Sequence, residues 1–310
     1  MIALLAPGQG SQTPGMLSPW LELPDSDDAR AQLDAWSKIS DLDLVALGTT
    51  ATAEEITDTA VTQPLVVAAT LLAHAELAKR RNGPLSGGGV IVAGHSVGEI
   101  AAYAIAGVIS PDDAVMLAAT RGREMAKACA LEPTGMAAVL GGDEAEVLAR
   151  LEGLDLTPAN RNAAGQIVAA GPLTALDKLA EDPPAKARVR KLATAGAFHT
   201  QYMAPALEAY SAAVEKVTTA GVSAPTATLL SNRDGQPVAS AAEAMDQLVA
   251  QLTRPVRWDL CTETMRNRGV TAIVEFPPAG TLAGIAKREL RGTPTHAVKS
   301  PADLDGLPEL

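Results

Sequence analysis

The chain has 310 residues, of which 47% are hydrophobic and 20% charged, a composition typical of folded globular proteins and not of disordered chains. Its formal net charge of -11 argues against a generic nucleic-acid binder, because neutralising phosphates requires a basic surface. The length suits one large domain with an insertion, or two domains.

The cysteine content and the apolar segments exclude several further classes. Cys129 and Cys261 form no C-x-x-C pair and have no Cys/His ligand spacing, so neither a disulfide framework nor a metal site is expected. The N-terminal apolar run is short and lacks a basic flank, unlike a signal peptide. No stretch approaches the roughly 20 apolar residues of a membrane span. We therefore expect a cytoplasmic protein without a membrane partner.

The first 130 residues alternate short apolar runs with Ala- and Leu-rich segments of helical periodicity. The apolar runs end at glycine or proline and suit buried parallel strands over Ile2–Ala6 and Val90–Ala93. Helices are expected over Gln63–Arg80, over Glu99–Ala106, and from the N-cap Ser110 to about Ala130. This alternation predicts an α/β fold.

The pattern of predicted elements changes near Gly135, where the elements become shorter. They predict a strand, helix, strand, strand, helix, strand order in a small α+β unit. Five segments are assigned within this order: Met136–Leu140, Asp143–Leu151, Asn160–Ala170, Leu173–Leu179 and Arg188–Thr194. After Gly196 the alternation of apolar strands and longer helices seen in the first 130 residues returns. Helices are expected over Ala204–Thr219 and Ala241–Thr253, and strands over Ala227–Ser231 and Ala272–Phe276. The predicted division is a large unit, residues 1–130 and 195–310, with residues 131–194 inserted.

The most informative segment is Gly94-His-Ser-Val-Gly-Glu99, which places G-x-S-x-G between a predicted strand and a predicted helix. This is the context of a nucleophile elbow, in which a serine lies in a sharp turn with its hydroxyl exposed. The glycines let strand and helix approach closely, and the N–H after the serine can bind an oxyanion. Ser96 is therefore the predicted nucleophile.

A serine hydroxyl needs a general base, and the chain has four histidines. His74 lies within a predicted helix, and His296 lies near the C-terminus. His95 adjoins Ser96 in a tight turn, where neighbouring side chains diverge. His199 follows a predicted strand, and loops at strand ends form the sites of open α/β sheets. Elimination selects His199, but the pattern selects no orienting acid, and a backbone carbonyl could take that role.

Two further features have open interpretations. The Gly-rich turn Pro7-Gly-Gln-Gly-Ser-Gln12 follows the first predicted strand, and its N–H groups suit an oxyanion or a phosphate. Basic residues cluster in residues 186–191 and 287–291. Each cluster is either solvated surface or a docking site for an acidic partner.

Six short motifs occur in the order found in one known family. They are P-G-Q-G-S-Q at Pro7–Gln12, T-Q-P at Thr62–Pro64, G-H-S-V-G-E at Gly94–Glu99, R-G-R-E-M at Arg121–Met125, G-A-F-H at Gly196–His199 and Q-L-T-R-P-V-R-W at Gln251–Trp258. In these motifs the chain resembles the malonyl-CoA:acyl-carrier-protein transacylases of dissociated fatty-acid synthesis. It equally resembles the acyltransferase domains of polyketide synthases.

The resemblance covers nearly the whole chain and implies a hydrolase-like parallel-sheet core with an inserted ferredoxin-like α+β subdomain. It also implies a Ser96–His199 dyad whose histidine is held by a backbone carbonyl at Gln251. The implied oxyanion hole consists of the N–H groups of Gln9 and Val97.

The resemblance further implies that Arg121 holds the free carboxylate of a malonyl group in a bidentate pair. From the pattern alone, an arginine in a helix would be a surface charge. A buried guanidinium left unpaired would penalise acyl groups that lack a carboxylate, so the implied role is physically sound. Three polar residues match positions near the family's pocket: Gln63, Asn160 and Asn162.

These residues predict transfer of a malonyl group from malonyl-CoA to the phosphopantetheine thiol of an acyl carrier protein through a malonyl-Ser96 ester. Malonyl-CoA is a substrate, and no cofactor is expected. The predicted carrier docking surface includes the basic run Lys186, Arg188, Arg190 and Lys191, and the protein is expected to be a monomer. The alternatives are a polyketide-dedicated acyl loader, an acyl-thioester hydrolase with the same dyad, and a catalytically silent carrier-binding subunit.

Overall fold

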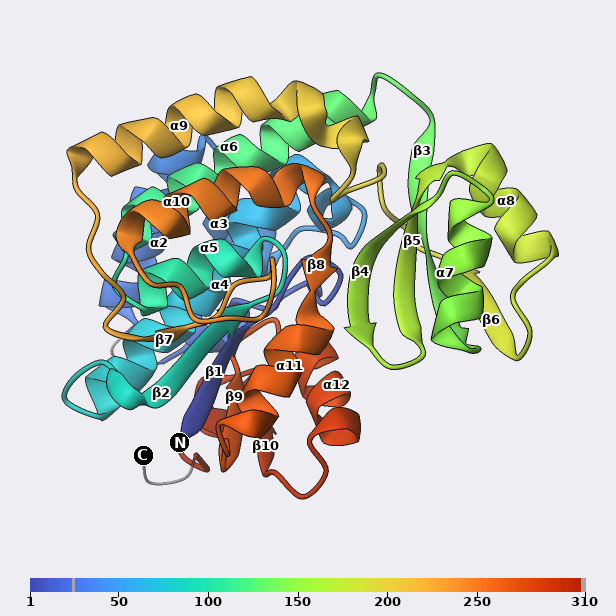
Figure 1. The fold of residues 1–310 in the computed structure, drawn as a ribbon. Coiled ribbons are helices and arrows are strands. Elements are labelled where there is room, and N and C mark those ends of the chain that lie inside the picture. The colour runs from blue at the N-terminus through green and yellow to red at the C-terminus, as the bar shows by residue number, and fades with distance from the viewer. Residues whose placement is uncertain (24–25, 308–310) are drawn as a thin grey trace.

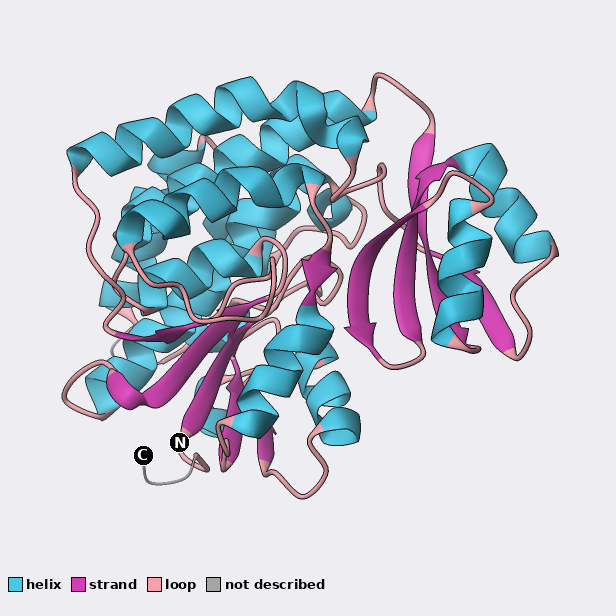
Figure 2. Cartoon of the chain, in the orientation of Figure 1, coloured by secondary structure: helices cyan, strands magenta, loops and turns pink. Residues whose placement is uncertain are grey.

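The computed structural model describes residues 1–23 and 26–307 (Figures 1 and 2). These residues form two sheets, and the larger part of the molecule is built on the first, sheet A. Its strands are β1 (Ile2–Ala6), β2 (Gly87–Gly94), β7 (Ala227–Leu229), β9 (Ala272–Glu275) and β10 (Thr295–Ala297). All neighbours pair in parallel, in the order β10-β9-β1-β2-β7. The expected α/β core with a parallel sheet is confirmed.

Helices cover both faces of sheet A. On one face lie α4 (Thr59–Arg80), α5 (Gly98–Ile105) and α6 (Pro111–Cys129), and on the other lie α11 (Trp258–Asn267) and α12 (Thr281–Glu289). Further helices are α1 (Ser18–Leu21), α2 (Asp27–Ser40), α3 (Leu44–Thr49), α9 (Leu207–Ala220) and α10 (Ala241–Ala250). Short 3-10 turns are η1 (Glu55–Thr57), η2 (Gln201–Ala206), η3 (Gln251–Thr253) and η4 (Pro301–Leu304).

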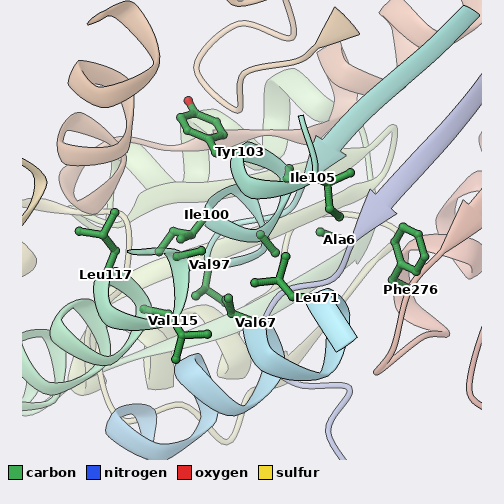
Figure 3. Close-up of a cluster of buried hydrophobic side chains, with 14 of the residues drawn as sticks. Ala6, Val67, Leu71, Val97, Ile100, Tyr103, Ile105, Val115, Leu117 and Phe276 are labelled. Atoms are coloured by element: carbon green, nitrogen blue, oxygen red, sulfur yellow. The ribbon is translucent and has the colours of Figure 1, made fainter. Parts of the chain in front are cut away.

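Sheet A is the middle layer because successive side chains of each strand point to opposite faces. Leu4 of β1 belongs to the apolar cluster of α4, α5 and α6, whereas Leu5 belongs to the cluster of α11 and α12. Figure 3 shows Val67 and Leu71 of α4 with Ile100 of α5 in the first cluster. Burial on both faces explains why β1 and the Val90–Ala93 part of β2 are continuous apolar runs.

Sheet B stands beside the larger part (Figure 1). Its strands are β3 (Thr134–Gly141), β4 (Thr157–Ala163), β5 (Gln166–Pro172), β6 (Ala187–Lys191) and β8 (Val256–Arg257), in the order β6-β3-β5-β4-β8. Two helices, α7 (Glu144–Glu152) and α8 (Leu173–Glu181), share one apolar cluster with β3 and β5. The β3-α7-β4-β5-α8-β6 order is ferredoxin-like, as the resemblance implied.

Several boundaries differ from the expected ones. The segment Asn160–Ala170 contains the turn between β4 and β5, where Gly165 has a φ of 68°. α4 begins at Thr59, before Gln63, because the Asp58 side chain caps it by accepting from Ala60 N–H. β8 lies outside residues 131–194 yet pairs with β4 of sheet B. The division of the chain at residues 131 and 194 stays a prediction.

In the described residues, one helix is long and apolar enough to cross a membrane, namely α4. The expectation that no stretch approaches a membrane span was therefore wrong. The most apolar 18-residue stretch of this helix is 72% buried inside the protein. Its side chains pack against α5 and α6, which accounts for their apolar character without a membrane.

The parallel strands bring their carboxyl ends to one edge of sheet A. The loop after β1 contains Gln9, the turn after β2 contains Ser96, and the loop after β7 contains Asn232. Residues far apart in sequence therefore meet at this edge, which is where ligands bind in open α/β sheets.

Candidate active site

Ser96 occupies a tight turn between β2 and α5. Its φ is 55°, a strained left-handed conformation of the kind found in nucleophile elbows. Close packing requires the flanking glycines: a Cβ on Gly94 would lie 2.0 Å from Gly98 O, and one on Gly98 would lie 2.2 Å from Ala6 O. The motif therefore encodes the close approach of α5 to β1 and β2.

The Ser96 Oγ lies 2.7 Å from His199 Nε2. His199 lies in the loop between β6 and η2, with a φ of 60°, and its Nδ1 is 2.8 Å from the carbonyl oxygen of Gln251. When Nδ1–H donates to that carbonyl, Nε2 is left to accept the Ser96 proton. The structure thus brings together the serine and histidine selected from the sequence and the carbonyl implied by the resemblance.

The dyad faces a cavity of about 390 Å³ lined by loops of sheet A and by strands β3, β4 and β5 of sheet B. This volume suits a small-molecule site. The predicted site residues in its lining are Gln9, Gln63, Ser96, Val97, Arg121, Asn160, Asn162 and His199. Gln251 lies behind the dyad and contacts the lining through hydrogen bonds.

Arg121 of α6 lines this cavity, and only 1% of its surface is exposed. Its Nη1 donates to Gln63 Oε1 at 2.8 Å, and its Nη2 donates to Gln251 Oε1 at 2.9 Å. Both acceptors are neutral amides, so the guanidinium is oriented but not neutralised by them. Its other N–H groups can pair with an anionic ligand. The surface-charge interpretation of this helical arginine is therefore wrong.

Sheet B reaches the elbow through Asn162, whose Oδ1 lies 2.8 Å from His95 Nε2. The His95 ring also packs edge-on against Trp258, with centroids 5.5 Å apart. Burial lowers the pKa of His95 and so favours the neutral ring. Asn160 lies on the same strand, is buried and lines the cavity. His95 is thus part of the cavity wall and holds the two sheets together there.

The loop after β1 lies directly against the elbow. A Cβ on Gly8 would lie 2.7 Å from His95 O, so only glycine lets the backbone of this loop come so close. Gln9 follows it in the cavity lining, and Val97 is the N-cap of α5, where N–H groups lack partners within the helix. Their role as oxyanion donors stays a prediction.

Sequence reasoning assigned no role to Glu99 and Asn232, which are both 1% exposed. Asn232 Oδ1 accepts from Ser96 N–H at 2.9 Å, and Asn232 N–H donates to Glu99 Oε1 at 2.7 Å. Burial raises the pKa of Glu99 to about 8, although hydrogen bonds and the Arg121 charge oppose the shift. Two signals were present: Glu99 ends the G-H-S-V-G-E motif, and Asn232 follows a predicted strand.

The cysteines are both free. Burial raises the pKa of Cys129 to about 11 and that of Cys261 well above its ordinary value, which disfavours a thiolate nucleophile at either position. Across residues 1–23 and 26–307, no group of three or more His, Cys, Asp or Glu side chains is placed to hold a metal ion.

The sequence model of the acyl transferase domain family matches residues 4–302 of the chain. The chain belongs to the acyl transferase domain family. This acyltransferase is 76% identical over 310 residues to the malonyl CoA-acyl carrier protein transacylase of Mycobacterium tuberculosis, and the match covers 100% of both chains.

Solved structures of the family have the same fold as this acyltransferase. The crystal structure of MCAT from Mycobacterium tuberculosis is 74% identical, with a TM-score of 0.92 and 98% of each chain covered. A malonyl-transacylase in complex with a type II PKS acyl-carrier protein is 28% identical, with a TM-score of 0.89 and coverage of 98% of this chain and 97% of that one. The hydrolase-like core with a ferredoxin-like insertion is thus the fold of these relatives.

Proposed function

We propose that this acyltransferase moves a malonyl group from malonyl-CoA to the phosphopantetheine thiol of an acyl carrier protein. One observation carries the proposal: a Ser–His dyad and a buried arginine, which has no carboxylate contact within residues 1–23 and 26–307, face the same cavity. The full-length relative at 76% identity is named for this reaction, and a more distant relative binds an acyl-carrier protein.

In the first half-reaction His199 Nε2 takes the Ser96 proton, and Ser96 Oγ attacks the thioester carbonyl. The oxyanion forms against the N–H groups of Gln9 and Val97, and its collapse breaks the C–S bond. The CoA thiolate leaves with the proton from His199, and malonyl-Ser96 remains. The carbonyl of Gln251 keeps the imidazole oriented throughout.

The second half-reaction runs through the same atoms in reverse. His199 takes the proton of the carrier thiol, the thiolate attacks the ester carbonyl, and Ser96 recovers its proton as the C–O bond breaks. A thioester replaces a thioester, so the overall exchange is close to reversible. The proposed chemistry uses side chains, backbone groups and the two substrates, with no cofactor.

The test is the intact mass of the protein seconds after mixing with malonyl-CoA, followed by addition of the holo-carrier protein. We expect a malonyl adduct that then moves to the carrier. Discharge to water at the same rate without carrier would instead indicate a hydrolase, and preference for a polyketide carrier would indicate a dedicated loader. No adduct and no CoA release would leave a silent carrier-binding subunit.

The pH dependence of acylation tests the proposed base. Burial, and next the charge of Arg121, lower the pKa of His199 to about 3. Because His199 stays unprotonated well below its ordinary 6.5, the rapid-quench rate of Ser96 acylation should not fall through a histidine titration between about pH 7 and pH 5. A half-maximal rate near pH 6.5 would contradict this.

The same shift has a consequence for stability. Between its ordinary pKa of 6.5 and about 3, His199 binds a proton in the unfolded state and not in the native state. Its contribution to stability is therefore present above pH 6.5 and is lost as the pH falls through this window.

We propose that the basic run formed by Lys186 and the β6 residues Arg188, Arg190 and Lys191 is part of the carrier docking surface. Its four cations are exposed, and β6 leads directly into Leu192, Ala193 and Thr194 of the cavity lining. Arg188 and Arg190 lie on one face of the strand, and Lys191 pairs with Asp177. The alternative is a charged edge strand that discourages pairing with another chain.

Reversing both charges in Arg188→Glu/Arg190→Glu should lower kcat/KM for the carrier about tenfold and leave acylation by malonyl-CoA unchanged. The matched control is Lys38→Glu/Lys216→Glu, which changes the net charge equally at exposed positions on α2 and α9. Equal effects of the two variants on carrier transfer would reject the docking surface.

We further propose that the protein works as a soluble cytoplasmic monomer. Burial of α4 in the core supports solubility, because its apolar face is already covered. Light scattering of the purified protein would test the oligomeric state.

A further inference from the structure

The Gln251 side chain joins the dyad to the arginine of the cavity. Its Oε1 accepts from Arg121, while its Nε2 donates to Glu99 Oε2 at 2.5 Å. Nε2 also lies 3.1 Å from Ser96 O and 3.2 Å from Asn232 Oδ1. The amide can serve Arg121 only in this orientation, because a rotation by 180° would place its NH₂ group against the guanidinium.

Glu99 makes the shortest contact of the Gln251 amide, and it is the ionisable one among the three acceptors that the described residues provide. The other Glu99 oxygen accepts from the backbone N–H of Asn232, which cannot reverse its direction. Protonation leaves both carboxyl oxygens able to accept, whereas a glutamine at position 99 must present one NH₂ group. That NH₂ group would face either the Asn232 N–H or the Gln251 amide, and only the Gln251 amide can turn.

Resting on the proposed malonyl transfer, we infer that Glu99 is a positioning residue that sets acyl selectivity by holding the Gln251 amide oxygen toward Arg121. Glu99 itself is absent from the lining of the catalytic cavity. Its influence passes through Gln251 to the guanidinium that receives the malonyl carboxylate. An acetyl group makes no such pair, so it is affected less.

A second cavity gives experimental access to Glu99. It measures about 400 Å³, and its lining includes Glu99 and Gln251 together with Glu243, Gln247 and Arg254. In the described structure its lining shares neither Ser96 nor His199 with the catalytic cavity. If the Glu99 side chain is removed, a small anion can therefore reach position 99 through this second cavity and without entering the catalytic cavity.

The first experiment compares kcat and KM for malonyl-CoA and acetyl-CoA in Glu99→Gln. The ratio of the two kcat/KM values should fall at least tenfold toward acetyl, mainly through a higher KM for malonyl-CoA. Glu243→Gln is the control, since it removes a nearby carboxylate that also lines the second cavity but bonds to Arg233 and Gln247. It should keep the wild-type ratio.

The second experiment is chemical rescue of Glu99→Ala, with folding checked by circular dichroism. Formate supplies two acceptor oxygens, and formamide of similar size replaces one with a donor. Formate should restore the malonyl preference several-fold, while formamide should not. Wild-type protein in the same solutions corrects for formate competing at Arg121.

Two outcomes would overturn the inference: an unchanged ratio in folded Glu99→Gln, or equal rescue by formate and formamide. An equal loss for both acyl groups is a case of the first outcome, since it leaves the ratio unchanged, and it would show a purely structural role. Failure of the proposed function is seen separately with wild-type protein, which would then form no malonyl adduct or would discharge the adduct to water as fast as to the carrier.

Discussion

Ser96→Ala should abolish the acyl-enzyme adduct and lower malonyl transfer by at least about 10⁴-fold. The variant loses the hydroxyl that lies against the base His199, while the cavity, Arg121 and the oxyanion groups stay in place. CoA binding should survive, so the loss should appear in kcat and not in the dissociation constant. The measurement is intact mass after mixing with malonyl-CoA, combined with the steady-state transfer rate.

Ser11→Ala is the matched control. Ser11 lines the same cavity, but its hydroxyl lies 2.6 Å from Thr281 Oγ1 and not against a base. This variant should keep the adduct. An adduct of undiminished amount in Ser96→Ala would place the nucleophile elsewhere and reject the dyad.

Arg121→Ala should reverse the acyl preference. Loss of two charge-assisted hydrogen bonds to the malonyl carboxylate should lower kcat/KM for malonyl-CoA by about 10³-fold. The rate with acetyl-CoA should rise, because acetyl no longer leaves a buried guanidinium unpaired. The measurement is competition between the two thioesters, read as the mass of the adduct on Ser96.

The control for Arg121→Ala lies on the same helix. Arg123 is half exposed, pairs with Glu124 and is absent from the cavity lining, so Arg123→Ala should keep the malonyl preference. Arg121→Lys should not restore the wild-type preference, since an ammonium cannot reproduce the bidentate geometry. A malonyl adduct that forms at the normal rate in Arg121→Ala would remove the arginine from substrate recognition.

The two variants separate chemistry from selection within one cavity. The serine determines whether any ester forms, and the arginine determines which acyl group is accepted. Gln251 links the two, because its side chain bonds both the Ser96 backbone and the guanidinium. Glu99 acts on both through its hydrogen bond with Gln251. This arrangement explains why polar side chains are buried where the core could otherwise be apolar.

Much of the fold was predictable because its signals are local. β1 was predicted with its observed ends, and Gly94 of the elbow lies against Gly98 and Glu99, which are close to it in sequence. The helix start at Thr59 was missed because the cap formed by Asp58 precedes the apolar pattern that was used to find the helix. β8 was missed because two residues carry no periodicity, and its pairing depends on a strand about 96 positions earlier.

The sequence by itself determined the elements of the core, the elbow with Ser96, and the choice of His199 among four histidines. Their local backbone geometry depends on neighbouring residues, so short motifs are sufficient to reveal it. Only the tertiary structure decided that Arg121 is buried, that His95 bonds Asn162, and that Glu99 and Asn232 support the dyad. The hydrogen bonds that Glu99 accepts from Asn232 and Gln251 join residues 133 and 152 positions apart. Contacts of that range exist only after the parallel strands bring their loops to one edge, and no local pattern encodes them.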